Sequence, residues 1–174
     1  MHFVLLHVCF VNSSFQDKKL SRAVAASTVL NHPRSRGSLT LQSADPKAAP
    51  IIDCGMLEDP DDVSRLVDGV RRQLSFWKTE PIASQVVEFD PRTKPLFNGS
   101  EDDIVKHIKA TGSHAWHPVG TCAIGKVVDE SLCVMGVKNL RVADASILPN
   151  LSSGNTMIPA FLCGARAADI IMGK

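Results

Sequence analysis

The sequence predicts an α+β fold, and two kinds of periodicity support this prediction. Apolar and polar residues alternate around 38–42, as they do in a half-buried strand. In 61–77 the apolar residues instead recur at the spacing of one helix face. A third stretch, 158–171, is rich in alanine and has a proline in its first turn, which favours another helix.

Length and composition are those of one globular domain without a strong charge. The 174 residues are 44% hydrophobic, which suffices for a sizeable core. Lys+Arg 19 and Asp+Glu 18 leave a formal net charge of +1, so we expect no nucleic acid and no membrane as partners. The five cysteines are an odd number without a Cys-x-x-Cys pair, which predicts neither disulfides nor a metal site.

Residues 3–11 form an apolar run that we interpret as a buried strand. A signal peptide is the alternative, but the run lacks a basic beginning and a small-residue cleavage site. The run is also shorter than the roughly 20 residues that a membrane-spanning helix needs.

Capping residues predict where the first two helices begin. Asp59 and Pro60 suit an N-cap followed by a first helical position. Ser100, with the acidic Asp103 three residues later, fits a variant of the capping box. The expected elements are strands near 38–42 and 139–143 and helices over 61–77, 101–110 and 158–171.

Residues that can carry chemistry concentrate after residue 113. Spacing alone allows three interpretations of His117. It could bind a metal together with His114 and Cys122, be a structural histidine, or act as a general base beside a cofactor. Pro118 and Gly120 interrupt the regular elements that usually hold metal ligands, so the last two interpretations stay open. The tract reads His-Ala-Trp-His-Pro-Val-Gly-Thr-Cys at 114–122, Val-Val-Asp at 127–129, Gly-Val-Lys-Asn-Leu-Arg-Val-Ala-Asp-Ala-Ser at 136–146 and Ser-Gly-Asn-Thr-Met-Ile-Pro at 153–159.

These four pieces, in this order, resemble the C-terminal signature of the glucose-methanol-choline (GMC) family of flavin oxidoreductases. Upstream, Ser-Arg-Gly-Ser-Leu-Thr-Leu-Gln-Ser-Ala-Asp-Pro at 35–46 and Ile-Ile-Asp at 51–53 are similar to the family's substrate domain. The resemblance covers about residues 33–174. It implies a substrate domain of antiparallel sheet and helices, followed by the C-terminal strand and helix of an FAD domain.

The resemblance also implies a reaction, in which an alcohol passes hydride to FAD while a histidine takes the hydroxyl proton. His117 matches that histidine, because a neutral imidazole can accept a proton at working pH. Asn155 matches the asparagine version of the family's second active-site position. Its amide can donate a hydrogen bond to the substrate oxygen.

Four further residues match positions that contact the cofactor in the family. Asp144 and Ala145 match the place where the chain runs beside the ribityl and diphosphate groups of FAD. Thr156 and Met157 match backbone contacts to the isoalloxazine, at the positive end of the last helix. Asp144 is equally suited to cap a turn, and the two roles are compatible.

Members of full length begin with a strand, a Gly-x-Gly-x-x-Gly turn and a helix that cradle the FAD diphosphate. No two of the 11 glycines here have that spacing, so we expect a C-terminal fragment that lacks the Rossmann part and alone holds FAD weakly. The missing FAD-binding segment is then an expected partner, besides a small alcohol. The alternative is a non-catalytic remnant or interaction module. The expected parts are a strand-like remnant at 1–32, a substrate domain at 33–116 and a flavin-side segment with the active site at 117–174.

Overall fold

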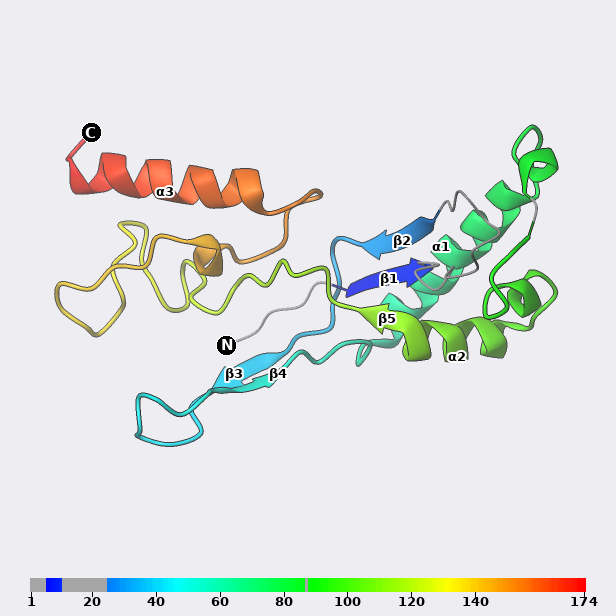
Figure 1. Cartoon of the computed structure of the whole chain (residues 1–174). Coiled ribbons are helices and arrows are strands. Elements are labelled where there is room, and N and C mark those ends of the chain that lie inside the picture. The colour runs from blue at the N-terminus through cyan, green and yellow to red at the C-terminus, as the bar shows by residue number, and fades with distance from the viewer. Residues whose placement is uncertain (1–5, 11–24, 87) are drawn as a thin grey trace. The chain divides into compact units, whose positions relative to one another are not determined.

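The computed structural model describes residues 6–10, 25–86 and 88–174. These residues form helices and small antiparallel sheets, as an α+β chain should, and they divide into two compact units (Figure 1). The sheet-helix unit combines 6–10 and 25–30 with 59–114, whereas the C-terminal unit combines 31–58 with 115–174. The predicted N-terminal strand is confirmed for 6–10, and its other residues lie outside the described part of the chain.

The sheet-helix unit contains a three-stranded antiparallel sheet in the order β2-β1-β5. Helix α1 packs against β2 and against α2, and α2 also contacts β1 and β5 (Figure 1). The strand β5 was not predicted from the sequence. The elements are β1 (Leu6–Phe10), β2 (Ala26–Leu30), α1 (Pro60–Trp77), α2 (Glu101–Thr111) and β5 (Gly112–Ser113).

Helix α1 begins and packs as the sequence predicts. The Asp59 carboxylate accepts a hydrogen bond from the Asp61 amide at 2.9 Å, and Pro60 occupies the first turn, where no amide proton is needed. The predicted apolar face is buried, and the carboxylate of Asp62 is buried beside it. The buried apolar residues of this face are Leu66, Val67, Val70 and Leu74.

A close approach between α1 and β2 depends on Gly69. A Cβ atom at this position would come within 2.4 Å of the Thr28 methyl carbon Cγ2. One turn further along, the Thr28 hydroxyl donates a hydrogen bond to Gln73 Oε1 at 3.3 Å. Because glycine is a poor helix former, its presence inside α1 is explained by packing against the sheet rather than by helix propensity.

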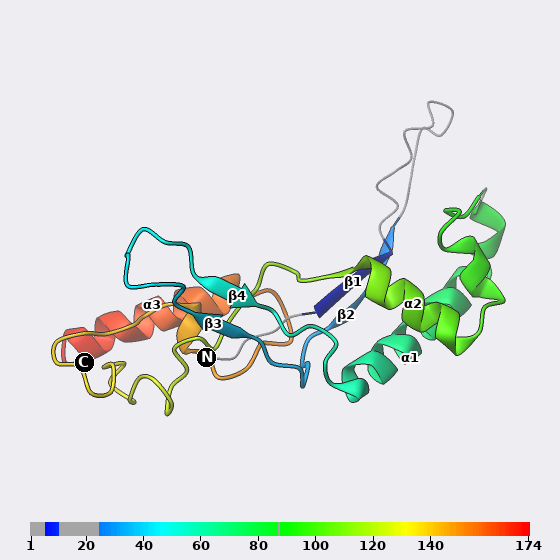
Figure 2. The same cartoon turned by 90° about the horizontal axis from the view of Figure 1, so that it is seen from below.

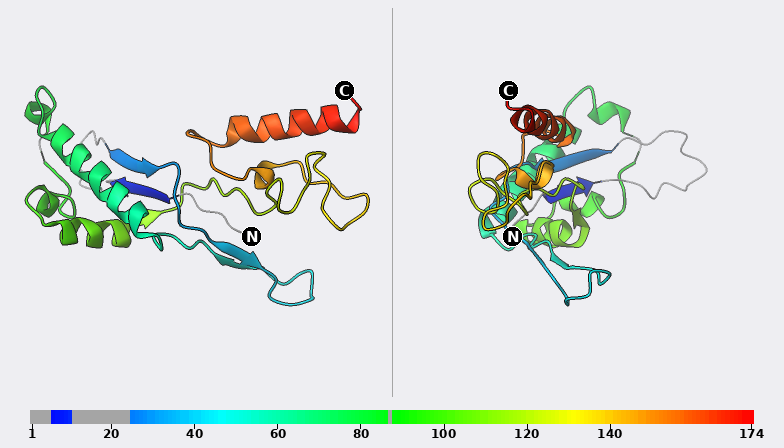
Figure 3. Two further views of the ribbon diagram at one scale, coloured as in Figure 1. Left: turned by 180° about the vertical axis from the view of Figure 1, so that it is seen from behind. Right: turned by 90° about the vertical axis from the view of Figure 1, so that its left-hand side faces the viewer.

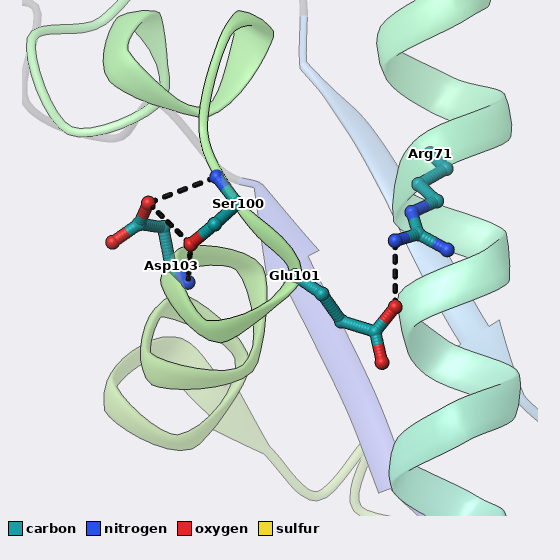
Figure 4. A network of polar contacts seen from close by, with 4 residues as sticks. All are labelled: Arg71, Ser100, Glu101 and Asp103. Carbon is teal, nitrogen blue, oxygen red and sulfur yellow. Dashed lines mark hydrogen bonds and ion pairs between the residues drawn. The ribbon is translucent and has the colours of Figure 1, made fainter.

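Helix α2 begins with the predicted capping box (Figure 4). The Ser100 hydroxyl accepts a hydrogen bond from the Asp103 amide at 3.3 Å, and the Asp103 carboxylate accepts one from the Ser100 amide at 2.9 Å. Figure 4 also shows Arg71 of α1 reaching Glu101 of α2, with 2.6 Å between guanidinium and carboxylate. Both side chains of this pair are at least half exposed, so it adds about 0–1 kcal/mol to stability.

Hydrogen bonds to a buried carboxylate, that of Asp90, hold the loop between α1 and α2. Asp90 is buried, and its carboxylate accepts hydrogen bonds from the Arg92 amide at 2.7 Å and from the Arg92 guanidinium at 3.1 Å. Hydrogen bonding from Arg92 lowers the pKa of Asp90 below its ordinary value of 3.8. On α2, burial lowers the pKa of His107 below its ordinary value of 6.5, with the positive charge of Arg92 acting in the same direction.

The C-terminal unit opens with a two-stranded antiparallel hairpin (Figure 2). Strand β3 (Ser38–Thr40) pairs with β4 (Ile51–Asp53), so the strand predicted at 38–42 is confirmed for its first three residues. A Cβ atom on Gly37 would lie 2.2 Å from the Asp53 carbonyl oxygen. Glycine is therefore required where the two arms of the hairpin meet.

The strand predicted at 139–143 is wrong. Asn139 has a φ of 60° and Leu132, in the segment opposite, has a φ of 63°. These left-handed residues turn both segments away from extended backbone, so no ladder propagates. The pairing that remains is one bridge between Cys133 and Arg141, flanked by hydrogen bonds from the Val134 amide to the Leu140 carbonyl at 2.9 Å and from the Val142 amide to the Leu132 carbonyl at 3.1 Å.

The last helix, α3 (Met157–Ile171), confirms the prediction for 158–171. It runs beside the segment that contains the short 3₁₀ turn Ala145–Ile147 (Figure 3). Its buried residues, Cys163 and Ala167, pack against Val128, Leu132 and Ile147. None of the described helices has the length and apolarity needed to cross a bilayer.

Replacing Gly69 by alanine is predicted to destabilise the chain. Overpacking against Thr28 costs about 1–3 kcal/mol, and the gain in helix propensity offsets only about 1 kcal/mol of it. In a Thr28→Ser background, which removes the methyl group and keeps the hydroxyl, the same change should become stabilising by about 1 kcal/mol. Urea unfolding of the four variants measures this cycle. Gly164→Ala is the control, because a Cβ atom added at Gly164 meets no atom within 4 Å. This change should be stabilising in either background. If the effects of Gly69→Ala and Thr28→Ser on stability were simply additive, the close approach would be contradicted.

Stability is predicted to fall as the pH is lowered from about 7 to about 5, because the folded-state pKa of His107 is depressed. At a pH below the ordinary pKa of histidine, the unfolded chain binds a proton at this side chain and the folded chain does not. Proton binding therefore stabilises the unfolded state and lowers the free energy of unfolding. The depressed pKa of Asp90 adds a further loss at more acidic pH, below about 4. Urea unfolding against pH should show a shallower slope for His107→Gln than for the unchanged chain, and an equal slope for the two would contradict the prediction.

Candidate functional site

Two of the sequence motifs are joined by backbone hydrogen bonds in the C-terminal unit. The Cys122 amide donates to the Ser146 carbonyl at 2.9 Å, and the Ile124 amide donates to the Ile147 carbonyl at 3.0 Å. The segment that follows His117 is thereby held against the turn that follows Asp144. A small apolar cluster of Val119 with Leu151, and with Ala115, Ala145 and Leu148 around them, supports the same region.

His117 itself is half-buried and contacts the beginning of α3. Its Nδ1 atom lies 3.1 Å from Oγ1 of Thr156, the N-cap residue of α3. The Thr156 hydroxyl makes no capping hydrogen bond to the helix, whereas the Thr156 carbonyl accepts the Ala160 amide at 2.9 Å. The His117 ring is thus attached to the N-terminal end of the last helix by a side chain of that helix.

Asn155, the second predicted catalytic residue, directly precedes Thr156 and is exposed. The His117 side chain therefore contacts the residue that follows Asn155 in the chain. Among the described residues there is no hydrogen bond between His117 and Asn155. The catalytic roles of both residues stay predictions.

The loop before Asn155 is braced from a distant part of the same unit. The Asn31 amide nitrogen Nδ2 donates to the Ser153 carbonyl at 3.0 Å, and His32 Nε2 lies 3.0 Å from Ser153 Oγ. Within the loop, the Ser152 hydroxyl donates to the Gly154 carbonyl at 2.7 Å. Sequence reasoning missed Asn31, His32 and Ser153, because side chains more than 120 residues apart carry no local pattern.

Asp144 caps the 3₁₀ turn that follows it. Its carboxylate accepts a hydrogen bond from the Ser146 amide at 2.8 Å, so one of the two predicted roles, capping a turn, is confirmed. Ala145, beside it, packs into the cluster of Val119 and Leu151. A direct contact of Asp144 or Ala145 with a cofactor stays a prediction.

The first turn of α3 has free donors and no negative charge. No acidic residue lies in this turn, and no side chain caps it. The amides of Met157 and Ile158 precede the first possible helical acceptor, so they have no partner inside the helix. Both residues are more than half exposed. A helix end of this kind favours a negatively charged or electron-rich ligand.

The other face of α3 holds a buried thiol. Burial raises the pKa of Cys163, and the nearby negative charge of Asp144 raises it further. Burial and the raised pKa both disfavour the thiolate, which is the reactive form of a cysteine. Among the residues that the structure describes, no group of three His, Cys, Asp or Glu side chains is arranged to hold a metal ion.

Comparison with known proteins gives a consistent result. A family model described as GMC oxidoreductase matches residues 33–164. The alcohol dehydrogenase [acceptor] of Pseudomonas putida is 39% identical over 147 residues, which are 82% of this chain and 26% of that protein. The oxygen-dependent choline dehydrogenase of Rhizobium rhizogenes is 37% identical over 154 residues, which are 83% of this chain and 27% of that protein.

Solved structures agree with these relatives. Formate oxidase superposes with a TM-score of 0.78 at 28% identity, covering 99% of this chain and 31% of the other. A fungal aryl-alcohol oxidase superposes with a TM-score of 0.73 at 27% identity, covering 86% of this chain and 25% of the other. The chain thus spans well under half the length of each of these proteins.

The packing of α3 predicts that Cys163 is protected in the native chain. A thiol reagent at pH 8 should modify Cys163 on the order of tenfold or more slowly than the partly exposed Cys54, Cys122 and Cys133. The protection should vanish in urea, because it comes from burial under the helix. Mass spectrometry of modified peptides measures all four rates. Equal rates in the native chain would mean that α3 does not stay packed on its core.

Proposed function

The chain belongs to the GMC oxidoreductase family, and on that premise we propose that it supplies the proton acceptor and the oxygen-binding amide for FAD-dependent oxidation of an alcohol. FAD is the cofactor of this family, and oxidation of alcohol-type donors is the chemistry of the relatives. The single observation that supports the active site most strongly is the 3.1 Å contact between His117 Nδ1 and Thr156 Oγ1, because it joins two motifs that are 39 residues apart.

Each residue of the proposed site has one chemical task. FAD, when bound, would supply the acceptor for the hydride of the carbon that carries the hydroxyl group. His117 Nε2 takes the hydroxyl proton, so the C–H and O–H bonds break and a carbonyl double bond forms. The Asn155 side-chain amide donates a hydrogen bond to the same oxygen and stabilises the negative charge that develops there.

The chain suits the ring end of FAD, whereas it offers no glycine-rich cradle for the diphosphate. The amides of Met157 and Ile158, at the positive end of α3, suit the electron-rich edge of an isoalloxazine ring. In the proposal Thr156 and Met157 contact the ring through their backbone, and Asp144 and Ala145 lie beside the ribityl and diphosphate groups. The 11 glycines include no Gly-x-Gly pair, so the chain has no cradle of its own for the diphosphate.

The diphosphate cradle is proposed to come from a partner segment, the N-terminal FAD-binding part of the family. The exposed side of α3 supports this, since several large apolar side chains exposed along one helix are typical of an interface. Residues 33–116 are then the substrate domain and 117–174 the flavin-side part. The exposed large apolar residues of α3 are Met157, Ile158, Phe161 and Leu162, between 58% and 69% exposed, together with Ile171 and the C-cap residue Met172.

The function is tested by joining the N-terminal part of the Pseudomonas putida relative, the part outside the alignment, to the front of this chain. The joined protein should retain FAD through purification, and anaerobic stopped-flow mixing with primary alcohols should reduce it. His117→Ala should retain FAD and slow reduction by about 10²–10⁴-fold, the usual contribution of a positioned base. Asn155→Ala should slow reduction less, by about 10²-fold, because one oxyanion donor is lost.

Asn98→Ala is the matched control, since Asn98 is an exposed asparagine in the other unit, and its reduction rate should be unchanged. An unchanged rate in His117→Ala together with a slow His114→Ala variant would assign the base to His114. A protein that binds FAD stoichiometrically but is reduced by no alcohol would favour the non-catalytic module.

A further inference from the structure

We propose that the Thr156 side chain is a positioning residue that accepts a hydrogen bond from His117 Nδ1–H and so leaves Nε2 as the proton-accepting atom of the ring. The inference rests on the proposed function, which requires an unprotonated ring nitrogen. It goes beyond that function because it assigns a role to the Thr156 hydroxyl, whereas the cofactor contact proposed for Thr156 involves only its backbone.

The geometry points to Nδ1 as the occupied atom. Thr156 Oγ1 lies 3.1 Å from Nδ1, within hydrogen-bonding distance, whereas Nε2 makes no hydrogen bond with any described residue. In a neutral imidazole one nitrogen carries the proton and the other carries the lone pair. The partner of one nitrogen therefore decides what the other can do.

The Thr156 hydroxyl is available for this task because the helix does not use it. As the N-cap residue it would ordinarily accept a hydrogen bond from an amide of the first turn, but no such bond forms in α3. Its oxygen has lone pairs to accept with, and its own proton can rotate to another acceptor.

An accepting hydroxyl also suits both states of a base. Once Nε2 has taken a proton, both ring nitrogens are donors, and the bond from Nδ1–H to Thr156 Oγ1 remains unchanged. With the opposite orientation, in which the hydroxyl donates to Nδ1, the neutral ring carries its proton on Nε2 and has no lone pair for the alcohol. The accepting arrangement therefore needs no reorganisation during proton transfer.

The position of Thr156 is itself supported from the far side of the loop. Asn31 and His32 both contact Ser153, three residues before Thr156, at 3.0 Å. The Thr156 carbonyl is held by the Ala160 amide at 2.9 Å. The hydroxyl thus extends from a backbone held on both sides, which limits the distance it can move from the His117 ring.

The test is the tautomer of His117 in the chain as it exists, without flavin. Nitrogen-15 NMR of histidine-labelled protein at alkaline pH distinguishes protonated from unprotonated ring nitrogens, and a His117→Gln variant assigns the signals among the six histidines. The expected result is a proton on Nδ1 and a lone pair on Nε2. In Thr156→Val the ratio of the two tautomers should move toward that of a free imidazole by about two- to tenfold, the weight of one hydrogen bond. Thr156→Ser should restore it.

A proton on Nε2 in the native chain would overturn the proposal, because the hydroxyl would then donate to Nδ1. An unchanged ratio in Thr156→Val, with amide spectra showing the native fold, would overturn it as well. If Thr156→Val does not fold, a native ratio in Thr156→Ala would overturn the proposal, whereas a shifted one would support it. Loss of the proposed function is seen separately, in flavin reduction by the joined protein, since the tautomer is read without any flavin or alcohol.

Discussion

The C-terminal unit depends on a pairing between two segments that belong to no regular element. The amides of Cys122 and Ile124 donate to the carbonyls of Ser146 and Ile147, and this alignment holds the histidine motif against the turn that Asp144 caps. In an irregular segment the backbone amides have no ladder of regular partners, so each partner has to be specified individually. The apolar contact between Val119 and Leu151 packs in the same region of the unit. From there the chain leads directly into Asn155 and α3.

Helix α3 has two faces that serve different purposes. One face buries Cys163 and Ala167 against the core of the unit, and small residues there allow the close approach. The other exposes Phe161 and Leu162. A face so apolar is not needed for the helix to form, since polar residues with good helix propensity would serve equally well. Such an exposed apolar face is expected of a helix that packs between this unit and the longer part of the family fold that the chain does not cover.

The charges around α3 are consistent with its proposed place at a flavin. Negative charge is absent from its first turn, while the carboxylate of Asp144 is used to cap a neighbouring turn. In the part of the chain that the structure describes, no acidic side chain of the first turn neutralises the positive end of the helix. Thr156, the N-cap residue of α3, lies between the His117 ring and the positive end of the helix.

Local signals in the sequence determined the helices, since Asp59 and Ser100 cap helices whose apolar spacing predicts them. The candidate site residues His117, Asn155, Asp144 and Thr156 follow from the resemblance of the ordered motifs to the family, and their roles in catalysis and cofactor binding stay predictions. The strand expected at 139–143 failed because an alternating pattern does not reveal the left-handed backbone of Asn139 and of Leu132 in the segment opposite. Only the tertiary structure joined His117 to Thr156, and Asn31 and His32 to Ser153. Periodicity and capping reach a few residues along the chain, whereas these contacts are selected by how distant segments pack.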